Sequence, residues 1–569
     1  MTTHVDIPSA PRVAVVPGRS EAASETRAPS PWWRLAPVLV ASAFAVAYLI
    51  VQPRTVDLAA SVFRSRLFGE APWTIWNNSW YSGHPTLSYS VLVPALAWVL
   101  SPALLAALAT VLSAALFEPL ARGWFGSTAS RWGALWFGAG AATPMLSGRV
   151  TFAAAVPAAL GALLAVQRAR PWLGVLLAVL AGLLSPVVAL FLAFAGVAYA
   201  LSGARRLGGS PSKPLAAGRL RHALRDPRLA GLAIAVAAAA PPGLVALAFP
   251  DGGEGPFVFS AFWPVPLFAL AFALLVPARE RALRIGAGLY GLAAIADWAV
   301  SNPFGGNVVR LGALFGGPLL LCALQAAGRR RIGPLAIALL LAFGVWQWSA
   351  SVRDVAQTWG DRATEASFYA PLNDFLTRAD DGQPFRVEIP FTFSHWETAE
   401  VSPRFALARG WLRPDDVDYN HLFYGGRLDA DSYRHWLADH GVRFVAVPVG
   451  VKPDYSARRE LDLIASGLPY LRPAFRTPDW RVYEVAQPRA MALGSAQVVR
   501  LGIDDATLRF PQPGSALVRI RWSPYWRAAG ACVEQAGDWT RVVSRQAGEI
   551  ELEQDFSLGR LIDHGRRCA

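Results

Sequence analysis

The chain has 569 residues, of which 54% are hydrophobic and only 16% are charged, with a mean hydropathy of +0.33 and a formal net charge of +13. It is too apolar for an ordinary soluble protein and too charged for a pure bundle of membrane spans. The basic residues fall in short clusters between apolar runs, which is the positive-inside pattern of membrane proteins. This distribution argues against a role in nucleic-acid binding.

Residues 1–32 are rich in Pro, Ser, Thr and Ala and carry no periodic apolar face. They are predicted to form a disordered cytoplasmic tail. The first apolar run, 35–52, is preceded by Arg34 and contains no small-residue cleavage site. It is therefore interpreted as a signal anchor that stays in the protein.

Residues 33–350 are predicted to form a membrane domain, because a span needs about 20 apolar residues. The segment 171–202 would be about 48 Å long as one helix, which is too long for one crossing, and Ser185-Pro186 interrupts it. We therefore predict about eleven spans: 35–52, 91–119, 132–147, 151–167, 171–184, 187–202, 229–249, 262–278, 285–300, 310–327 and 333–350.

Charge predicts the orientation of these spans. Basic residues cluster at 168–170, 205–228, 279–284 and 329–331, whereas the loop 250–261 carries Asp251 and Glu254 and no basic residue. With the N-terminus inside, the alternation places every basic cluster in the cytoplasm and the acidic loop outside. The loop 53–90 and the whole of 351–569 then lie on the outer face of the plasma membrane.

Asp57 opens the outer loop 53–90, which is Trp-rich and predicted to contain little helix. A carboxylate at a membrane surface is costly unless it is solvated, paired or used. The functional interpretation is a general base that takes a proton from a substrate hydroxyl. The alternative is a solvated loop residue that pairs with Arg54 or Arg64.

Other polar residues at outer span ends are candidates for substrate binding. Trp76 and His84 could form a surface that stacks on a sugar or contacts a lipid phosphate, or could belong to an interfacial aromatic belt. Arg149, Asn307 and Arg310 follow glycines, and arginine holds phosphate bidentately. A phosphate clamp is one interpretation, and snorkelling to lipid headgroups is the other.

Three further patterns have simpler interpretations. Asp297 lies near the end of an apolar run and is either functional or paired with Arg310. The run 286–291 matches the dinucleotide pattern GxGxxG, but no strand precedes it, so helix packing is expected. His421, His435 and His440 lack the spacing of metal ligands and are predicted to be surface residues.

Residues 351–569 are predicted to form an outer α+β domain. A helix is expected over 431–440, capped by Asp429 or Asp431 and ended by Gly441. Cys532 and Cys568 lie in this outward domain, where a disulfide between them is predicted. Strands are expected at 385–389, 443–447, 481–485, 506–510, 517–522 and 549–552.

The topology and the outer-loop run, from Asp57 through Arg64, Trp76-Asn77 and Trp80 to Gly83-His84-Pro85, resemble the GT-C superfamily of integral membrane glycosyltransferases and its YfhO-like bacterial relatives. The likeness extends to Ser185-Pro186, Asn307 with Arg310, 409–411 and 420–424.

The resemblance implies a polyprenyl-phosphate sugar as donor, a glycan or glycolipid of the cell envelope as acceptor, and Asp57 as the catalytic residue of an inverting transfer. Many such enzymes carry a second nearby acid and a divalent metal. Here the next acid is Glu70, so a Mg²⁺ or Mn²⁺ requirement stays open. A transporter or flippase of a lipid or polymer, or a non-catalytic envelope assembly protein, are the alternatives.

Overall fold

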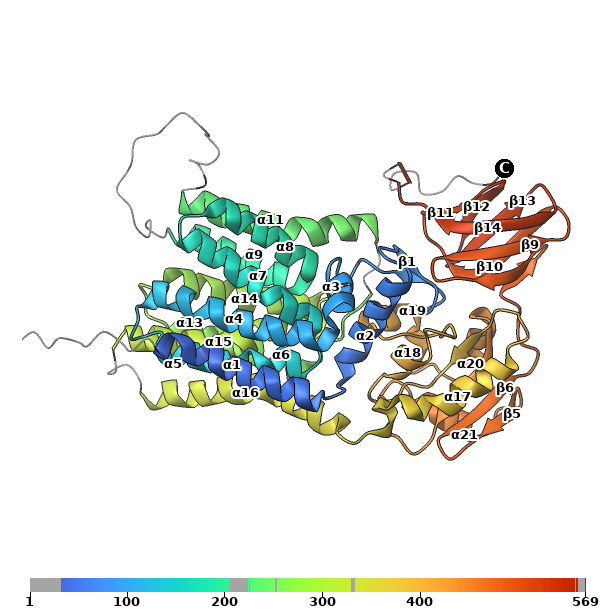
Figure 1. Cartoon of the computed structure of the whole chain (residues 1–569), viewed down its shortest axis with the longest axis horizontal. Helices are drawn as coiled ribbons and strands as arrows, with labels where there is room; N and C mark the ends of the chain where they lie inside the picture. Colours follow the sequence, from blue (N-terminus) through green and yellow to red (C-terminus); the bar gives the residue numbers. More distant parts are fainter. Residues whose placement is uncertain are drawn as a thin grey trace, which may run out of the picture.

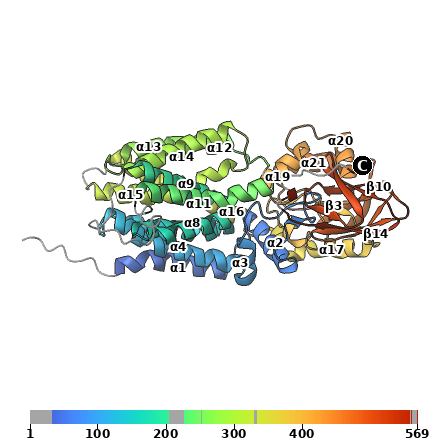
Figure 2. The same cartoon turned by 90° about the horizontal axis from the view of Figure 1, so that it is seen from above.

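The computed structural model describes residues 32–203, 224, 226–250, 253–328, 333–557, 559–560 and 568. A bundle of helices forms one half of an elongated molecule, and a domain with three sheets forms the other half (Figures 1 and 2). The predicted disordered tail, apart from Trp32, and most of the predicted basic clusters 205–228 and 329–331 lie outside the described residues.

The helices of the bundle run along the long axis of the molecule (Figure 1). Every segment predicted to span the membrane contains a helix. The helices are α1 (Trp32–Val51), α3 (Val93–Leu100), α4 (Pro102–Phe125), α5 (Arg131–Gly140), α6 (Ala142–Leu146), α7 (Val150–Gln167), α8 (Pro171–Leu184), α9 (Pro186–Leu201), α11 (Pro227–Ala248), α12 (Phe259–Phe262), α13 (Pro264–Leu275), α14 (Arg281–Ala299), α15 (Val309–Ala326) and α16 (Pro334–Thr358).

Six segments of the described chain are helical, long and apolar enough to cross a membrane, namely α1, α4, α7, α11, α16 and Gly305–Ala326, which contains α15. Shorter apolar helices are Pro171–Leu184, Pro186–Leu201 and Phe259–Leu275. The chain is thus a polytopic helical membrane protein, and the count of eleven crossings stays a prediction.

Polar caps set two of the helix breaks. Ser185 ends α8, and its hydroxyl accepts a hydrogen bond from the Val188 amide at the start of α9, which confirms the predicted break. The predicted span over 91–119 is not one continuous helix, because Ser101 adopts φ +68° and caps α4 by accepting from the Leu104 amide. The candidate span in this region is Pro102–Phe125. Pro occupies the first position of α4 and of α9, where its missing N–H costs nothing.

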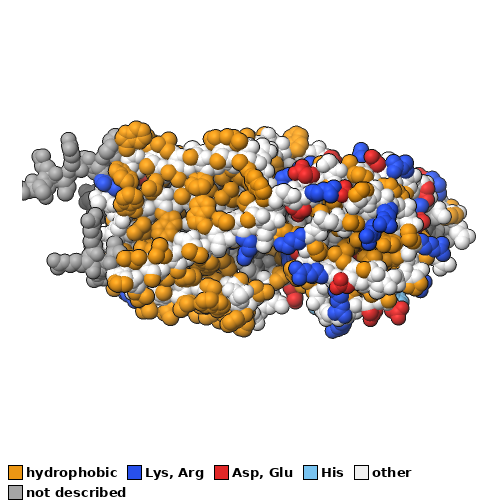
Figure 3. Space-filling model, turned by 90° about the horizontal axis from the view of Figure 1, so that it is seen from below, with side chains coloured by type: hydrophobic (Ala, Val, Ile, Leu, Met, Phe, Trp, Pro, Cys, Tyr) orange, Lys and Arg blue, Asp and Glu red, His pale blue; other side chains and the backbone are white. Residues whose placement is uncertain are grey.

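The two halves of the molecule differ in their surfaces. Apolar side chains cover the helical half, whereas Lys, Arg, Asp and Glu gather on the other half (Figure 3). Exposed leucines such as Leu108, Leu247 and Leu341 belong to this apolar surface, as expected for helices that face lipid. Arg279, between α13 and α14, donates to the carbonyl of Ala326, the last residue of α15.

The soluble domain begins where α16 ends. Its first part packs helices against a four-stranded sheet of order β3-β4-β6-β5, in which β3 and β4 are parallel and Val387 faces Phe444. The elements are α17 (Ala366–Ala379), β3 (Arg386–Glu388), α18 (Glu397–Glu400), α19 (Arg413–Tyr419), α20 (Ala430–Asp439), β4 (Val442–Pro448), α21 (Arg458–Ala465), β5 (Leu471–Arg476) and β6 (Trp480–Val485).

The last part of the chain is an antiparallel β structure of two four-stranded sheets, of order β12-β13-β10-β7 and β11-β14-β9-β8. A disulfide joins Cys532 of β12 to Cys568, so that prediction is confirmed. The strands are β7 (Ala492–Gly494), β8 (Gln497–Leu501), β9 (Asp505–Phe510), β10 (Gly514–Arg521), β11 (Trp526–Ala528), β12 (Ala531–Ala536), β13 (Trp539–Ser544) and β14 (Gly548–Gln554).

In the α+β part, the structure confirms the predicted caps of α20 and contradicts the predicted exposure of one histidine. Asp429 caps α20 by accepting from the Ser432 amide, and Gly441 has φ +64°, both as predicted. His421 and His435 are exposed, whereas His440 is buried against Trp436 and Trp539, so its surface prediction is wrong.

The loop between α1 and α3 lies at the junction of the two halves (Figure 1). It contains a helix, α2 (Val56–Glu70), and a short hairpin of β1 (Trp76–Asn77) and β2 (His84–Pro85). The prediction of little helix is therefore wrong for 56–70. The Trp80 indole N–H donates to Ser402 Oγ at 3.0 Å, and Gly410 leaves room for this ring.

Candidate functional site

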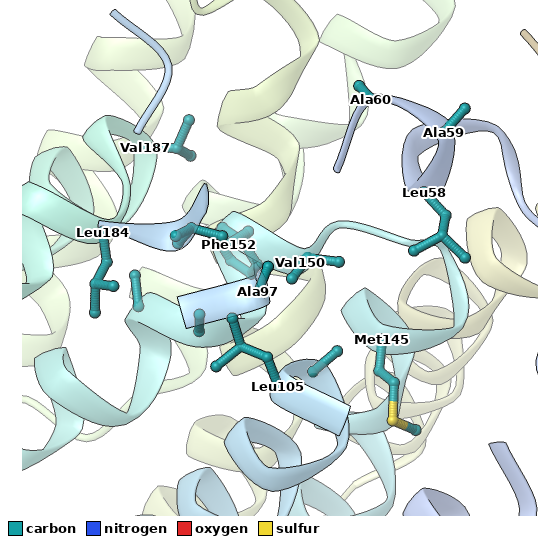
Figure 4. Close-up of a cluster of buried hydrophobic side chains, with 14 of the residues drawn as sticks. Leu58, Ala59, Ala60, Ala97, Leu105, Met145, Val150, Phe152, Leu184 and Val187 are labelled. Carbon is teal, nitrogen blue, oxygen red and sulfur yellow. The ribbon is translucent and has the colours of Figure 1, made fainter. Parts of the chain in front are cut away.

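Asp57 lies in the first turn of α2 and contacts Arg149 at the start of α7. The Arg149 Nε atom is 3.1 Å from Asp57 Oδ2. The close approach depends on Gly148, since a Cβ there would lie 2.6 Å from the Leu58 amide nitrogen and 2.7 Å from Thr55 Oγ1. Figure 4 shows Leu58 and Val150, the neighbours of these two residues, in one buried apolar cluster. Within the described part of the chain, Asp57 does not pair with Arg54 or Arg64, the two alternatives that the sequence offered.

A second carboxylate, Asp354, reaches the same guanidinium. It lies near the end of α16, and its Oδ2 atom is 3.8 Å from Arg149 Nη2. Beside it, the Ser147 and Ser351 hydroxyls are 3.1 Å apart and tie α16 to the α6–α7 turn. Asp354 was not among the sequence candidates, although its place just after the last apolar run puts it at the same end of the bundle as Asp57.

Arg310, the second residue of α15, belongs to the same cluster. Arg149, Asp57 and Tyr89 lie close enough to influence the charge of its guanidinium. Its guanidinium carbon lies 5.6 Å from the centre of the Phe152 ring. Three candidates from distant parts of the sequence, Asp57, Arg149 and Arg310, therefore meet at the end of the bundle that faces the soluble domain.

Two other candidates have only local contacts. The Asn307 amide donates to the Phe304 carbonyl at 2.8 Å within its own turn. The Asn302 amide, not Arg310, lies beside Asp297 and donates to its backbone carbonyl at 3.0 Å. The predicted ion pair between Asp297 and Arg310 is absent from the described residues, and a substrate contact of Asn307 stays a prediction.

Trp76 and His84 are buried in the junction. Trp76 packs edge-on against Trp526 in the core of the C-terminal β structure. The His84 ring stacks parallel to Trp80, and its Nε2 lies 3.2 Å from the Asn77 amide. Burial, aided by nearby Arg64, lowers the pKa of His84 to about 3, so its imidazole is neutral at physiological pH. Contact of Trp76 or His84 with a substrate stays a prediction.

The soluble domain holds the connection between α1 and α2, directly before Asp57. Arg54 forms an ion pair of 2.7 Å with Glu400. The indole N–H groups of Trp396 and Trp411 donate to the Arg54 and Val56 carbonyls at 3.3 and 3.0 Å. These contacts fix the entry to α2 and therefore the position of the Asp57 carboxylate.

Arg64 lies on α2, seven residues after Asp57, which is two helical turns. It is 8% exposed, and its guanidinium carbon lies 4.2 Å from the centre of the Tyr89 ring. Burial lowers the pKa of Arg64, against the opposing attraction of Tyr89 and Asp415.

An apolar cavity of about 320 Å³ lies inside the bundle next to this cluster. Phe152, which Arg310 approaches, and Leu311, its neighbour in sequence, both line the cavity. Gln167, the last residue of α7, and Leu283, near the start of α14, line the cavity as well. Along α7, the distance from Phe152 to Gln167 is about 22 Å.

The carboxylates of the site do not form an evident metal centre. Among the described residues, no group of three or more His, Cys, Asp or Glu side chains is placed to hold a metal ion. Asp57 and Asp354 share Arg149, whose guanidinium provides the positive charge between them. These residues do not by themselves fit Mg²⁺ or Mn²⁺, and the metal requirement that the sequence left open is not tested.

Comparisons with known proteins found similarity among solved structures. No family model matches the chain, and no curated protein matches it. Among solved structures, it is similar to the cryo-EM structure of the arabinofuranosyltransferase AftD from Mycobacteria, with a TM-score of 0.38 and 17% sequence identity. The match covers 81% of this chain and 40% of that chain. The neighbour is a glycosyltransferase, the class named by the sequence resemblance, but a likeness at this level assigns no residue role and no activity to this chain.

Proposed function

We propose that this protein is a membrane glycosyltransferase that moves a sugar from a polyprenyl-phosphate donor to a glycan or glycolipid acceptor of the cell envelope. The observation that supports it is the meeting of Asp57, Arg149 and Arg310 beside an apolar cavity. Such a transfer needs a base for the acceptor hydroxyl, cations for the donor phosphate and an apolar space for the isoprenoid chain.

In this proposal the donor phosphate binds at Arg149 or Arg310. Asp57 accepts the proton of the acceptor hydroxyl, and the acceptor oxygen forms a bond to the anomeric carbon. The bond from that carbon to the phosphate oxygen breaks, and polyprenyl phosphate leaves with the electron pair. Attack from the face opposite the phosphate inverts the anomeric configuration.

The location of the site supports a lipid-linked donor. Arg168 and Arg170 follow the last residue of α7, and Arg279 donates to the carbonyl of Ala326, the last residue of α15. Both helices start at the junction with the soluble domain, so these basic residues lie at the opposite end of the bundle. By the positive-inside rule, that end faces the cytoplasm and the site faces outward. Nucleotide sugars are absent there, and the soluble domain is the part available to bind the acceptor.

The test is sugar transfer by the full chain in lipid nanodiscs, with a radiolabelled polyprenyl-phosphate sugar and an envelope lipid extract as acceptor. Asp57→Asn keeps the side-chain volume and removes the base, so transfer should fall about 10²- to 10⁴-fold. Asp418→Asn, the same change at an exposed position of the soluble domain, is the matched control. Equal transfer by Asp57→Asn and wild type would remove Asp57 from the mechanism.

A further inference from the structure

Three buried arginines gather inside the soluble domain, between its α+β part and its C-terminal β structure. Arg386 is the first residue of β3, and Arg519 and Arg521 lie on β10. Their exposed fractions are 0%, 1% and 8%. The Arg386 Nη1 atom lies 3.4 Å from Sδ of Met491, and the Arg519 amide donates to the carbonyl of the same methionine. The side chains of the two parts therefore meet in one buried cationic cluster.

The acidic partners of this cluster are few and lie at the surface. Asp439 approaches Arg519 and Asp538 approaches Arg521, each at 3.8 Å, and both carboxylates are more than half exposed. Among the described residues, Arg386 has no acidic oxygen within 4.0 Å. Burial, together with repulsion from Arg519 and Arg521, lowers the pKa of Arg386. A buried cation without a counter-ion is expensive, so the cluster needs a compensating group.

The unpartnered atoms include the edge of Arg386 that suits an oxyanion. Its Nη1 atom donates to the His440 carbonyl at 2.9 Å, whereas Nε and Nη2 are buried without a hydrogen-bond partner among the described residues. Nε and Nη2 lie side by side on the planar guanidinium and can hold one anion through two parallel N–H groups. Arg519 donates to the Ala490 and Asp439 carbonyls, and its Nη2 atom is likewise buried and unpartnered. Backbone carbonyls thus use part of each guanidinium and leave the rest for an anion.

The imidazole of His440 adds a hydrogen-bond acceptor to the cluster. Its Nδ1 atom donates to the Trp436 carbonyl at 2.9 Å, since a carbonyl can only accept, so Nε2 carries a lone pair. Nε2 is buried and has no partner among the described residues. Burial, aided by the charges of Arg521 and Arg386, lowers the pKa of His440 to about 3, and the ring stays neutral. A hydrogen phosphate ion offers oxygens to the guanidiniums and an O–H to Nε2, whereas sulfate offers only oxygens.

We propose that Arg386, Arg519 and His440 form a binding site for inorganic phosphate that joins the two parts of the soluble domain. Arg386 and His440 come from the α+β part, and Arg519 comes from the β structure. Arg521 adds positive charge, and it ties the outer loop to the site by donating to the Tyr81 carbonyl at 2.8 Å. The side chains close tightly around the unpartnered atoms, so the Arg386 and Arg519 guanidiniums turn to admit the ion. The site does not depend on the proposed function.

The probe is inorganic phosphate, added to the purified full chain in detergent at constant ionic strength, with chloride as the reference anion. Binding is read as a saturable rise in the thermal midpoint from tryptophan fluorescence. At a phosphate concentration about a hundred times the dissociation constant, the midpoint should rise by about 5–10 °C for a domain of this size. Exclusion of phosphate from the protein surface also stabilises proteins, but that effect does not saturate and depends on no single arginine.

Arg386→Gln and Arg519→Gln should each weaken phosphate binding about tenfold or more, because each removes hydrogen bonds between charged groups. Arg481→Gln, the same change at an exposed position of β6, should bind like wild type. Arg386→Lys keeps a charge but loses the two-donor edge, so it should bind a few-fold more weakly, and it keeps the test usable if Arg386→Gln does not fold. A merely structural arginine would lower the phosphate-free midpoint when removed and leave the phosphate-induced rise unchanged.

The absence of a saturable rise in wild type would overturn the proposal, and so would an equal rise in wild type, Arg386→Gln and Arg519→Gln. Sulfate should bind more weakly than phosphate. Equal, arginine-dependent binding of sulfate would support the anion site and remove His440 from it. Glycerol phosphate tests for a phosphate ester, and its arginine-dependent binding at the same affinity would support the site and extend it to esters.

Discussion

Replacing Glu460 by Gln should stabilise the soluble domain at neutral pH. Glu460 is fully buried in α21, with Oε1 accepting a 2.7 Å hydrogen bond from Tyr433 and Oε2 lying 3.6 Å from Arg409 Nη1. The same guanidinium donates two hydrogen bonds, of 3.2 and 2.6 Å, to Asp416, and Glu388 lies 3.9 Å from it. One cation therefore faces three acids, and Glu460 has no cation of its own.

Burial raises the pKa of Glu460 from its ordinary 4.5 to about 7, and the attraction of Arg409 only partly opposes this. The folded state then keeps a proton that the unfolded chain loses above pH 4.5. The contribution of the Glu460 carboxyl to the free energy of unfolding is therefore greatest below pH 4.5, and it is lost as the pH rises to about 7. At about 1.4 kcal/mol per pKa unit, the cost at higher pH is about 3 kcal/mol. A glutamine, which is always neutral, avoids the cost.

The assay is thermal unfolding of the purified full chain, followed by tryptophan fluorescence at pH 5 and pH 8. For a domain of this size, about 3 kcal/mol corresponds to roughly 6–12 °C. Glu460→Gln should exceed wild type by that amount at pH 8 and by much less at pH 5. Glu365→Gln, at an exposed position of the same domain, should match wild type at both. A variant no more stable than wild type at pH 8, or equally shifted at both pH values, would refute the reasoning.

Three further predictions concern the junction and the C-terminal β structure. Gly410→Ala would place a Cβ 2.5 Å from the buried Trp80 ring, so it should lower stability by about 1–3 kcal/mol, and an unchanged thermal midpoint would contradict this packing. Peptide mapping under non-reducing conditions should find Cys532 linked to Cys568, and two free thiols would disprove the link. Because the pKa of His84 is about 3, His84→Gln should leave the shape of the pH–rate profile between 5 and 8 unchanged, and loss of an inflection near pH 6.5 in the variant would show that this imidazole titrates.

Local signals in the sequence predicted much of the fold. Proline and a preceding serine divide α8 from α9, as expected from the missing amide of Pro186. The similar break before α4 was not predicted, because Pro102 lies inside a continuous apolar run and can start a helix as readily as it can end one. The helix α2 was missed because the aromatic residues that suggested a loop are concentrated after Glu70.

The candidate site depended on contacts over long distances in the sequence, and only some of these follow from topology. Alternating spans place Asp57 and Arg149 at the same end of the bundle, so their meeting was a reasonable expectation. Asp354 reaches Arg149 only because α16 continues beyond its last apolar residue, which no local pattern shows. The burial of Arg64 and its stacking on Tyr89 likewise depend on packing between α2 and the segment before α3.

The most direct test is a cryo-EM structure of the full chain with a polyprenyl-phosphate sugar bound. The account predicts density for the phosphate against Arg310, the sugar within reach of the Asp57 carboxylate, and the isoprenoid chain in the cavity lined by Phe152 and Leu311. Donor density on the lipid-facing surface of the bundle, or at the end remote from the soluble domain, would contradict it.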